Sequence, residues 1–181
     1  MHADPVDDAR AMLVLGHGAG GGITAPDLTA AAAAARAVRV SVALVEQPYR
    51  VAGRRSPAPA RQLDAVWLEV VARLAGQPLV VGGRSSGARV ACRTSEATHA
   101  VGVLCLAFPL QPPQGRPSRL PELDAVTVPT LVVQGTRDHF GMPPAAPGRT
   151  VAQVAADHAL RTDLQTVANA VRAWLQSAAL R

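Results

Sequence analysis

The segment Gly83-Arg84-Ser85-Ser86-Gly87 has the residue types and the spacing for nucleophilic chemistry. It directly follows the apolar run 79–81 and opens a helical stretch, which places a G-x-S-x-G pattern at the junction of a strand, a sharp turn and a helix. The flanking glycines let strand and helix approach closely around a strained backbone position. Ser85 is therefore a candidate nucleophile, and the N–H of Ser86, at the start of the helix, is a candidate donor to a developing oxyanion. The alternative is a glycine-rich turn without chemistry.

A serine hydroxyl is a weak nucleophile, so it requires a base and a group that orients the base. Asp138 follows the apolar run 129–134, at the predicted end of a strand. His158 lies twenty positions further on, after a weaker apolar run and before the last helical stretch. With Ser85, these residues occur in the chain order nucleophile, acid, base. Taken alone, His158 has a simpler interpretation as a solvated surface histidine.

Four other residues compete for these roles, and each has a more ordinary interpretation. His139 adjoins the candidate acid, so its side chain should point away from that carboxylate. Asp157 adjoins the candidate base, and we expect it to cap the last helix. His99 falls in the turn after the third predicted helix, and His2 falls in a terminal segment that we expect to be mobile.

Five glycines occur among the seven residues 16–22, directly after the first apolar run. Backbone N–H groups in such a loop can face a substrate oxygen without obstruction by side chains. The phosphate-binding pattern G-x-x-x-x-G-K-[ST] is excluded because the chain contains no Lys. Residues 16–21 do fit the dinucleotide pattern G-x-G-x-x-G, and the acidic Glu46 follows 25 positions after them. A dinucleotide-binding enzyme is therefore the main competing enzyme class, but it leaves Ser85, Asp138 and His158 without a role.

Short apolar runs alternate with longer helical stretches along the chain. This alternation predicts an α/β fold with a mainly parallel sheet of about six strands and helices on both faces. The predicted strands are 11–16, 38–46, 78–83, 100–108, 129–134 and 149–155. The predicted helices are 27–36, 61–75, 86–97 and 160–178. Two segments rich in Pro, Gly and Arg, 47–59 and 109–121, are predicted to be loops that border the ligand crevice.

Apolar residues recur three and four positions apart in the second and the last of these helices, which predicts one buried face on each. Trp67 and Trp174 lie in these two stripes. We therefore expect both tryptophans to be core side chains rather than groups that stack on a ligand.

The chain has 181 residues, of which 49% are hydrophobic and 17% are charged, so we expect residues 1–181 to form one domain. The net charge is +5, but every basic residue is an Arg, these are spread along the chain, and only five residues are aromatic. This pattern does not favour nucleic acid as a partner. Cys92 and Cys105 lack the spacing of a metal site and are predicted to be buried, reduced thiols.

No apolar run has the length of a membrane span, and the first residues do not resemble a signal peptide. We therefore expect a cytoplasmic protein that has no membrane partner. The sequence leaves the oligomeric state open.

Taken together, these motifs resemble the α/β-hydrolase superfamily, and within it the small dienelactone-hydrolase-like serine hydrolases. The matching pieces are His17-Gly18-Ala19-Gly20, the segment 82–89, Phe108-Pro109-Leu110, the segment 134–141 and Asp157-His158. The resemblance implies that Ser85 is the nucleophile, Asp138 the acid and His158 the base. It also implies that the N–H groups of Ala19 and Ser86 form the oxyanion hole. The implied fold is a compact α/β-hydrolase domain, and we expect this chain to lack the inserted lid of larger hydrolases.

This chain departs from the resemblance at three positions. Dienelactone hydrolases use Cys as the nucleophile, where this chain has Ser85, so their lactone substrate does not carry over. Gln111 stands where similar proteins usually have His, and His139 stands where they usually have Pro.

These features predict a serine hydrolase that cleaves a small ester or related acyl bond without a metal or an organic cofactor. The alternative is a non-catalytic binding or scaffold protein that retains the hydrolase fold, because some proteins of this group are subunits of chromatin complexes. Arg50, Arg54 and Arg55, with Arg84 beside the candidate nucleophile, either favour an anionic acyl or alcohol group or are simply solvated. We prefer the second interpretation.

Overall fold

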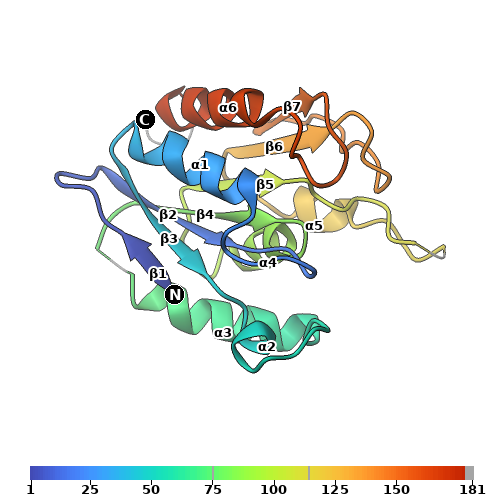
Figure 1. The fold of residues 1–181 in the computed structure, drawn as a ribbon, viewed down its shortest axis with the longest axis horizontal. Coiled ribbons are helices and arrows are strands. Elements are labelled where there is room, and N and C mark those ends of the chain that lie inside the picture. Colours follow the sequence, from blue (N-terminus) through green and yellow to red (C-terminus); the bar gives the residue numbers. More distant parts are fainter. Residues whose placement is uncertain (75, 114, 178–181) are drawn as a thin grey trace.

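A twisted β-sheet runs through the middle of the molecule and has helices on both of its faces (Figure 1). The computed structural model describes residues 1–181 except 75, 114 and 178–181. Within the described residues the strands are β1 (His2–Asp4), β2 (Ala11–Gly16), β3 (Val40–Val45), β4 (Leu79–Arg84), β5 (Gly102–Leu106), β6 (Thr130–Gly135) and β7 (Arg149–Val154). The helices are α1 (Pro26–Arg36), α2 (Pro48–Val51), α3 (Ala60–Ala72), α4 (Ser86–Thr94), α5 (Leu120–Asp124) and α6 (Leu164–Ser177).

The strand order places the loop after β4 at the centre of the sheet. The order is β1-β3-β2-β4-β5-β6-β7, and every pairing is parallel except that of β1 with β3. From β2 the chain moves to β3 on one side and then returns to β4 on the other side. Ligands of open α/β sheets bind at the carboxyl ends of the strands where the order reverses in this way. Ser85 follows β4 at this point.

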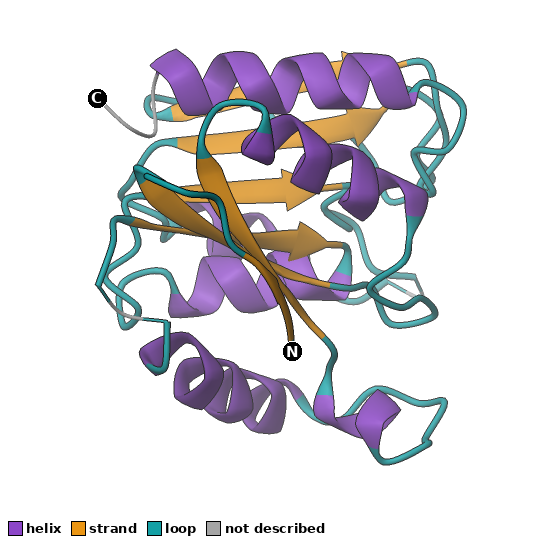
Figure 2. Cartoon of the chain, turned by 60° about the vertical axis from the view of Figure 1, so that its left-hand side comes forward, coloured by secondary structure: helices purple, strands orange, loops and turns teal. Residues whose placement is uncertain are grey.

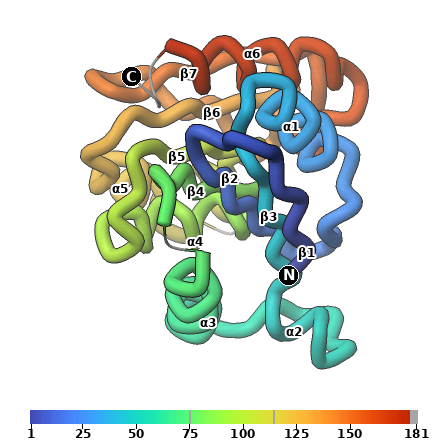
Figure 3. Tube along the Cα trace, turned by 90° about the vertical axis from the view of Figure 1, so that its left-hand side faces the viewer, coloured from blue at the N-terminus to red at the C-terminus, as the bar shows by residue number. Residues whose placement is uncertain are grey.

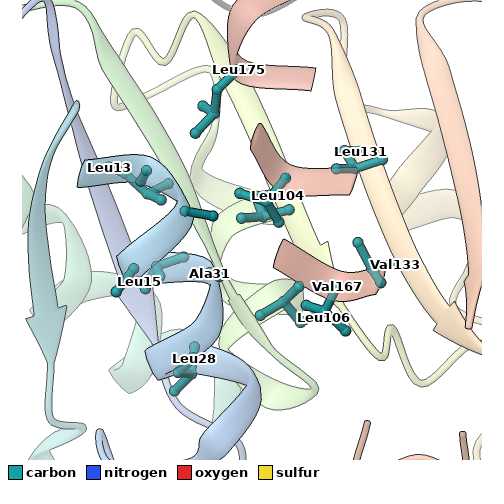
Figure 4. Packing of buried hydrophobic residues seen from close by; sticks show 14 of the residues in the cluster. Leu13, Leu15, Leu28, Ala31, Leu104, Leu106, Leu131, Val133, Val167 and Leu175 are labelled. Carbon is teal, nitrogen blue, oxygen red and sulfur yellow. The ribbon is translucent and has the colours of Figure 1, made fainter. Parts of the chain in front are cut away.

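One face of the sheet is covered by α1 and α6, which pack against each other (Figure 4). Alternate strand residues such as Leu13, Leu15 and Leu104 point to this face, because successive side chains of a strand lie on opposite faces. The alanines of α1 are small enough to let this helix lie close to α6, whose Val167 and Leu175 are fully buried. The burial of each large apolar side chain of this kind stabilises the folded state by about 1.5–3 kcal/mol.

The other face is covered by α3, α4 and α5, and Figures 2 and 3 show α3 on the opposite side of the sheet from α1 and α6. The intervening strand residues, such as Val14, Val81 and Val103, point to this face. Trp67 of α3 is 4% exposed on this side and Trp174 of α6 is 5% exposed on the other. Both tryptophans are thus core side chains, as their positions in the apolar stripes predicted.

Both cysteines lie in the core, as predicted. Cys92 of α4 and Cys105 of β5 are buried free thiols with their Sγ atoms 3.5 Å apart. The hydrogen bond with Cys92, together with burial, raises the pKa of Cys105 well above its ordinary value. These thiols therefore serve packing rather than nucleophilic chemistry.

The predicted fold class is confirmed, and each of the six predicted strands is present with ends that differ by at most two residues. The seventh strand is β1, formed by residues that we expected to be a mobile terminus. Its three residues pair with β3, and such a short edge strand carries too little pattern to be recognised. Between the described strands, no inserted lid domain is present, which agrees with the expected lid-less fold.

Helix ends were predicted less accurately than strands. The last helix begins at Leu164, not at residue 160, and Asp163 rather than Asp157 caps it by accepting from the N–H of Thr166. Asp157 instead accepts from the N–H of Ala159 in the preceding turn. The third predicted helix ends at Thr94 instead of residue 97. The predicted end residues 75 and 178 lie outside the described residues.

Candidate active site

The backbone at Ser85 is strained and is held at the tip of a sharp turn between β4 and α4. Its φ of 51° and ψ of −106° are rare for a residue with a side chain, and its N–H donates to the Leu106 carbonyl at 2.9 Å. Gly83 and Gly87 allow this turn, because a Cβ on either glycine would overlap the carbonyl oxygen of Gly16 in β2. The structure thus gives the physical reason for the G-x-S-x-G spacing.

The side chains of Ser85, His158 and Asp138 are in contact in a single chain of hydrogen bonds. His158 Nε2 lies 3.0 Å from Ser85 Oγ, and His158 Nδ1 lies 2.8 Å from Asp138 Oδ2. Because a carboxylate can only accept, Nδ1 carries the hydrogen and Nε2 is free to accept the proton of the Ser85 hydroxyl. The structure therefore brings together the three residues that the chain order had suggested.

Asp138 is fixed by donors on both of its oxygens, and its side chain is fully buried. Besides His158 Nδ1, it accepts from the N–H of Phe140 at 2.9 Å and from Gln134 Nε2 at 2.9 Å. Gln134 also donates to the carbonyls of Phe108 and Gly141, so one amide group joins three segments around the carboxylate. Sequence reasoning gave Gln134 no role, although a polar side chain at the end of the apolar strand β6 was a usable signal.

Two contacts fix the segment that carries His158. Gly135 at the end of β6 lets this segment lie close, because a Cβ there would stand 2.5 Å from the carbonyl oxygens of Ala156 and Asp157. The Arg84 guanidinium donates to the carbonyl of His158 at 3.1 Å. The backbone of the candidate base is thus tied both to the end of β6 and to the residue before Ser85.

Arg84 forms an ion pair with Asp27 in the first turn of α1, with Nε 3.0 Å from Oδ2. Burial raises the pKa of the Asp27 carboxyl, and the adjacent Arg84 opposes this rise. The charge of Arg84 is therefore balanced by a buried carboxylate, so this residue is part of the scaffold of the site.

Phe140 packs against the imidazole of His158, with the ring centroids 4.6 Å apart at an angle of 63°. His139 lies on the outer side of this pair and is exposed. Its side chain makes no hydrogen bond to Asp138 among the described residues, as expected from their adjacency. Phe140 belongs to a segment that matched the family resemblance, but its contact with His158 was not predicted.

The glycine-rich loop after β2 is anchored by a buried histidine. His17 donates from Nδ1 to the Gly18 carbonyl at 2.8 Å and accepts from the N–H of Gln47 on Nε2 at 2.9 Å. Desolvation lowers the pKa of His17, which favours the neutral ring that these two bonds require. Tyr49 adds a bond from its hydroxyl to the Ala19 carbonyl at 2.9 Å, so the loop has a fixed position.

Ala19 lies beside Ser85 and lines the same hollows. Its N–H makes no hydrogen bond to another described residue, and the N–H of Ser86 stands at the first position of α4, where helix geometry provides no partner. Both N–H groups are thus available as donors to a ligand.

Two hollows meet at Ser85. One has a volume of about 310 Å³ and is lined by Ser85, Ser86 and part of the Pro- and Arg-rich loops. The other has a volume of about 400 Å³ and is lined by Ser85, His158 and Arg84. A third hollow of about 600 Å³ lies at the opposite end of the sheet, near Leu79, and contains none of the three hydrogen-bonded side chains.

Arg50, Arg54 and Arg55 are exposed, and none of them lines either hollow at Ser85. The structure therefore agrees with the interpretation that these three arginines are solvated. Glu46, the acidic residue of the competing dinucleotide pattern, is also exposed.

Residues 9–170 match a family model described as an alpha/beta hydrolase domain. The chain belongs to the α/β-hydrolase family. This membership confirms the resemblance seen in the sequence and supports a hydrolase, in place of the dinucleotide-binding class.

Solved structures with the same fold include other α/β hydrolases. A proposed hydrolase of the α/β superfamily from Xanthomonas campestris has a TM-score of 0.74 at 23% identity, over 93% of this chain and 99% of that chain. A lid-less α/β serine hydrolase from the same organism has a TM-score of 0.76 at 20% identity, over 96% and 86% of the two chains. Est1E from Butyrivibrio proteoclasticus, solved with ferulic acid, has a TM-score of 0.79 at 13% identity, over 98% and 94%. At these identities the likeness concerns the fold alone.

A search of curated proteins gave no match. Among the described residues, no helix combines the length and the apolar character needed to cross a membrane.

Proposed function

We propose that this α/β hydrolase is a serine esterase that cleaves a small ester or related acyl bond through an acyl-enzyme on Ser85. The observation that carries the proposal is the position of His158, whose two ring nitrogens contact Ser85 Oγ and Asp138 Oδ2 at 3.0 and 2.8 Å. This arrangement lets one imidazole take the serine proton while the carboxylate stabilises the imidazolium that forms.

The proposed reaction has two halves. Ser85 Oγ attacks the ester carbonyl carbon while its proton passes to His158 Nε2, and the oxyanion accepts from the N–H groups of Ala19 and Ser86. His158 then gives the proton to the leaving alcohol, and an acyl-enzyme remains. In the second half, a water molecule attacks the acyl carbon and gives a proton to His158 Nε2. The bond from the acyl carbon to Ser85 Oγ then breaks, His158 returns the proton to Oγ, and the free acid leaves.

The alternative is a binding or scaffold protein on the same fold. Such a protein has no need for a strained Ser85, or for a buried carboxylate with donors on both oxygens. Strain of this kind costs about 1–3 kcal/mol and persists where function requires it. The hydrogen-bonded contacts of Ser85, His158 and Asp138 therefore favour the enzyme.

The test is turnover of short-chain p-nitrophenyl esters by the wild-type protein and by Ser85→Ala. We expect the substitution to lower kcat by at least about 10³-fold, because it removes the nucleophile. Ser56→Ala, an exposed change in the 47–59 loop, should retain the wild-type rate. A folded wild-type protein without esterase turnover would favour the scaffold alternative.

A further inference from the structure

The two hollows at Ser85 differ in their position relative to His158. In the proposed reaction the leaving alcohol must receive its proton from His158 Nε2, so the alcohol lies on the side that His158 occupies. His158 lines the hollow of about 400 Å³ and does not line the hollow of about 310 Å³. The larger hollow is therefore the alcohol side, and we refer to the smaller one as the acyl hollow.

The walls of the acyl hollow combine apolar and cationic side chains. Apolar contacts come from Ala58, Leu63 and Phe140, together with prolines of the two loops. Three arginines complete the wall, Arg89 and Arg93 of α4 and Arg119 before α5. Such a wall suits a short methylene chain that ends in a negatively charged group.

Two of the three arginines are neutralised by carboxylates. Arg89 makes two bonds to Glu122, at 2.8 and 2.6 Å. Arg93 makes two bonds to Asp64, at 2.9 and 2.6 Å. No ion pair among the described residues joins Arg119 to a carboxylate. The three guanidinium charges thus face the two carboxylates of Glu122 and Asp64, which leaves one positive charge in excess on the wall of the hollow.

Arg119 is held at the hollow by its bond from Nη1 to the Pro109 carbonyl at 2.9 Å, and it is half-buried. Burial lowers the pKa of Arg119 and the nearby charge of Arg89 lowers it further, while the Glu122 carboxylate opposes part of this fall. An anion beside the guanidinium would act in the same direction as Glu122 and favour its charged form. A guanidinium has five N–H donors, and its planar fork matches the two oxygens of a carboxylate.

We propose that the acyl hollow binds the free carboxylate of a dicarboxylic acid half-ester through Arg119, with the methylene chain against the apolar wall. This inference rests on the proposed esterase function and adds the substrate class. The specificity lies with an arginine of the 109–121 loop and not with Arg50, Arg54 or Arg55, which do not line the hollow.

The test compares two substrates that differ in one group. Mono-p-nitrophenyl adipate ends in a carboxylate, and p-nitrophenyl adipamate has the same length and ends in a neutral amide. At pH 7.5 and low salt, we expect kcat/KM of the wild-type protein to be roughly tenfold or more higher for the adipate, the size of a charge-assisted pair of hydrogen bonds. Because part of this preference is Coulombic, it should shrink as salt is added. Equal values for the two esters would overturn the inference.

Variants of the loop locate the charge that is responsible. Arg119→Gln should bring the ratio of adipate to adipamate close to one, and Arg119→Lys should retain part of the preference. Arg116→Gln removes the same charge three residues away, at an exposed position that does not line the acyl hollow, and should keep the wild-type ratio. A wild-type ratio in Arg119→Gln, or a ratio near one in Arg116→Gln, would contradict the assignment to Arg119.

Failure of this inference can be told apart from failure of the proposed function. Hydrolysis of both esters at equal rates would retain the esterase and reject the anionic substrate. If neither ester is cleaved, the rate at which a fluorophosphonate labels Ser85 is measured with free adipate or adipamide present. A labelling rate that adipate lowers and adipamide does not lower supports the inference. Equal lowering by both compounds, or by neither, rejects it. If Ser85 is not labelled at all, the proposed function fails and this inference fails with it.

Discussion

Gln134 helps to fix the position of Asp138 through its side-chain amide. Its Nε2 group donates to Asp138 Oδ2 and to the carbonyls of Phe108 and Gly141. Replacing Gln134 by an apolar side chain removes a donor from the buried Asp138 carboxylate and Phe108 carbonyl and from the partly buried Gly141 carbonyl. The cost should appear both in stability and in the orientation of the carboxylate that holds His158.

We expect Gln134→Leu to lower the free energy of unfolding by about 1–3 kcal/mol, the cost of unsatisfied buried polar groups. Esterase kcat should fall by at least about tenfold, because a displaced Asp138 no longer holds the His158 ring in line with Ser85. Urea unfolding and initial rates with p-nitrophenyl butyrate measure the two effects. Gln165→Leu, on the exposed face of α6, serves as the control and should change stability by less than about 0.5 kcal/mol. Wild-type kcat in Gln134→Leu would show that the amide does not position the carboxylate.

His17 makes stability depend on pH in a defined direction. Its pKa in the folded protein is lowered by burial, relative to the ordinary value of 6.5 that applies to the unfolded chain. Below pH 6.5 the unfolded chain therefore binds more protons than the folded protein, so stability falls as the pH decreases and is fully present above 6.5. At one unit below 6.5 this loss reaches at most about 1.4 kcal/mol.

The check is the unfolding free energy at pH 7.5 and at pH 5.5. We expect His17→Gln to be less stable than the wild type at pH 7.5, because the bond from the Gln47 N–H is lost. It should also lose less stability between the two pH values. His139→Gln, at an exposed position, should show the wild-type loss. An equal pH dependence in His17→Gln and the wild type would refute this assignment.

The sequence was sufficient to nominate Ser85, Asp138 and His158, because their order and their positions after strands are recorded in the chain. It was not sufficient for Gln134, Phe140 and Arg119, which act through contacts between segments that are distant in sequence. The prediction that Arg84 is simply solvated was wrong for the same reason, because its guanidinium is largely buried and forms an ion pair. Its partner Asp27 lies 57 positions earlier, and only the folded chain shows that their charges balance.

At the scale of elements, the turn between β4 and α4 depends on how closely β2 approaches it. Gly16 of β2 lies against both Gly83 and Gly87, so the strand, the turn and the helix meet with no space for a Cβ. Strand ends were predictable because Gly, Pro or polar residues flank most of the apolar runs. The start of the last helix was not, because Leu160 has a φ of 52°, which is not helical, and residues 160–163 lie outside α6.

Gly87→Ala should therefore destabilise the fold by about 3 kcal/mol, at the upper end of the cost of overpacking, because the obstructing atoms belong to the backbone of β2. Gly22→Ala is the matched control in the loop after β2, where an added Cβ meets nothing within 4 Å. It should change stability by less than about 1 kcal/mol. Urea titration of both variants measures the difference, and similar midpoints for the two would contradict the close approach.

At the scale of the whole molecule, the sheet has two separate hydrophobic layers, one on each face. Each layer contains one of the two tryptophans, Trp174 under α6 and Trp67 under α3. Both layers share the same strands, so neither can be lost without exposing the sheet. We therefore expect the chain to unfold as one cooperative unit, in agreement with the prediction of one domain.

Two variants with a single tryptophan report on the two faces separately. Trp67→Phe removes an indole whose Nε1 has no hydrogen-bond partner among the described residues, and it leaves Trp174 as the probe. Trp174→Phe leaves Trp67 as the probe. In each variant, the midpoint by tryptophan fluorescence should coincide with that by far-UV circular dichroism. Separate midpoints in either variant would mean that one face unfolds alone.

The central claim is that Ser85 is activated by His158 and Asp138 for attack on an acyl carbon. The most direct measurement is covalent labelling of the purified protein with a fluorophosphonate probe, followed by mass spectrometry of the labelled peptide. The account predicts one adduct, on Ser85, which is absent in Ser85→Ala and forms much more slowly in His158→Ala. A folded wild-type protein that takes up no label, or that carries it on another residue, would contradict the account.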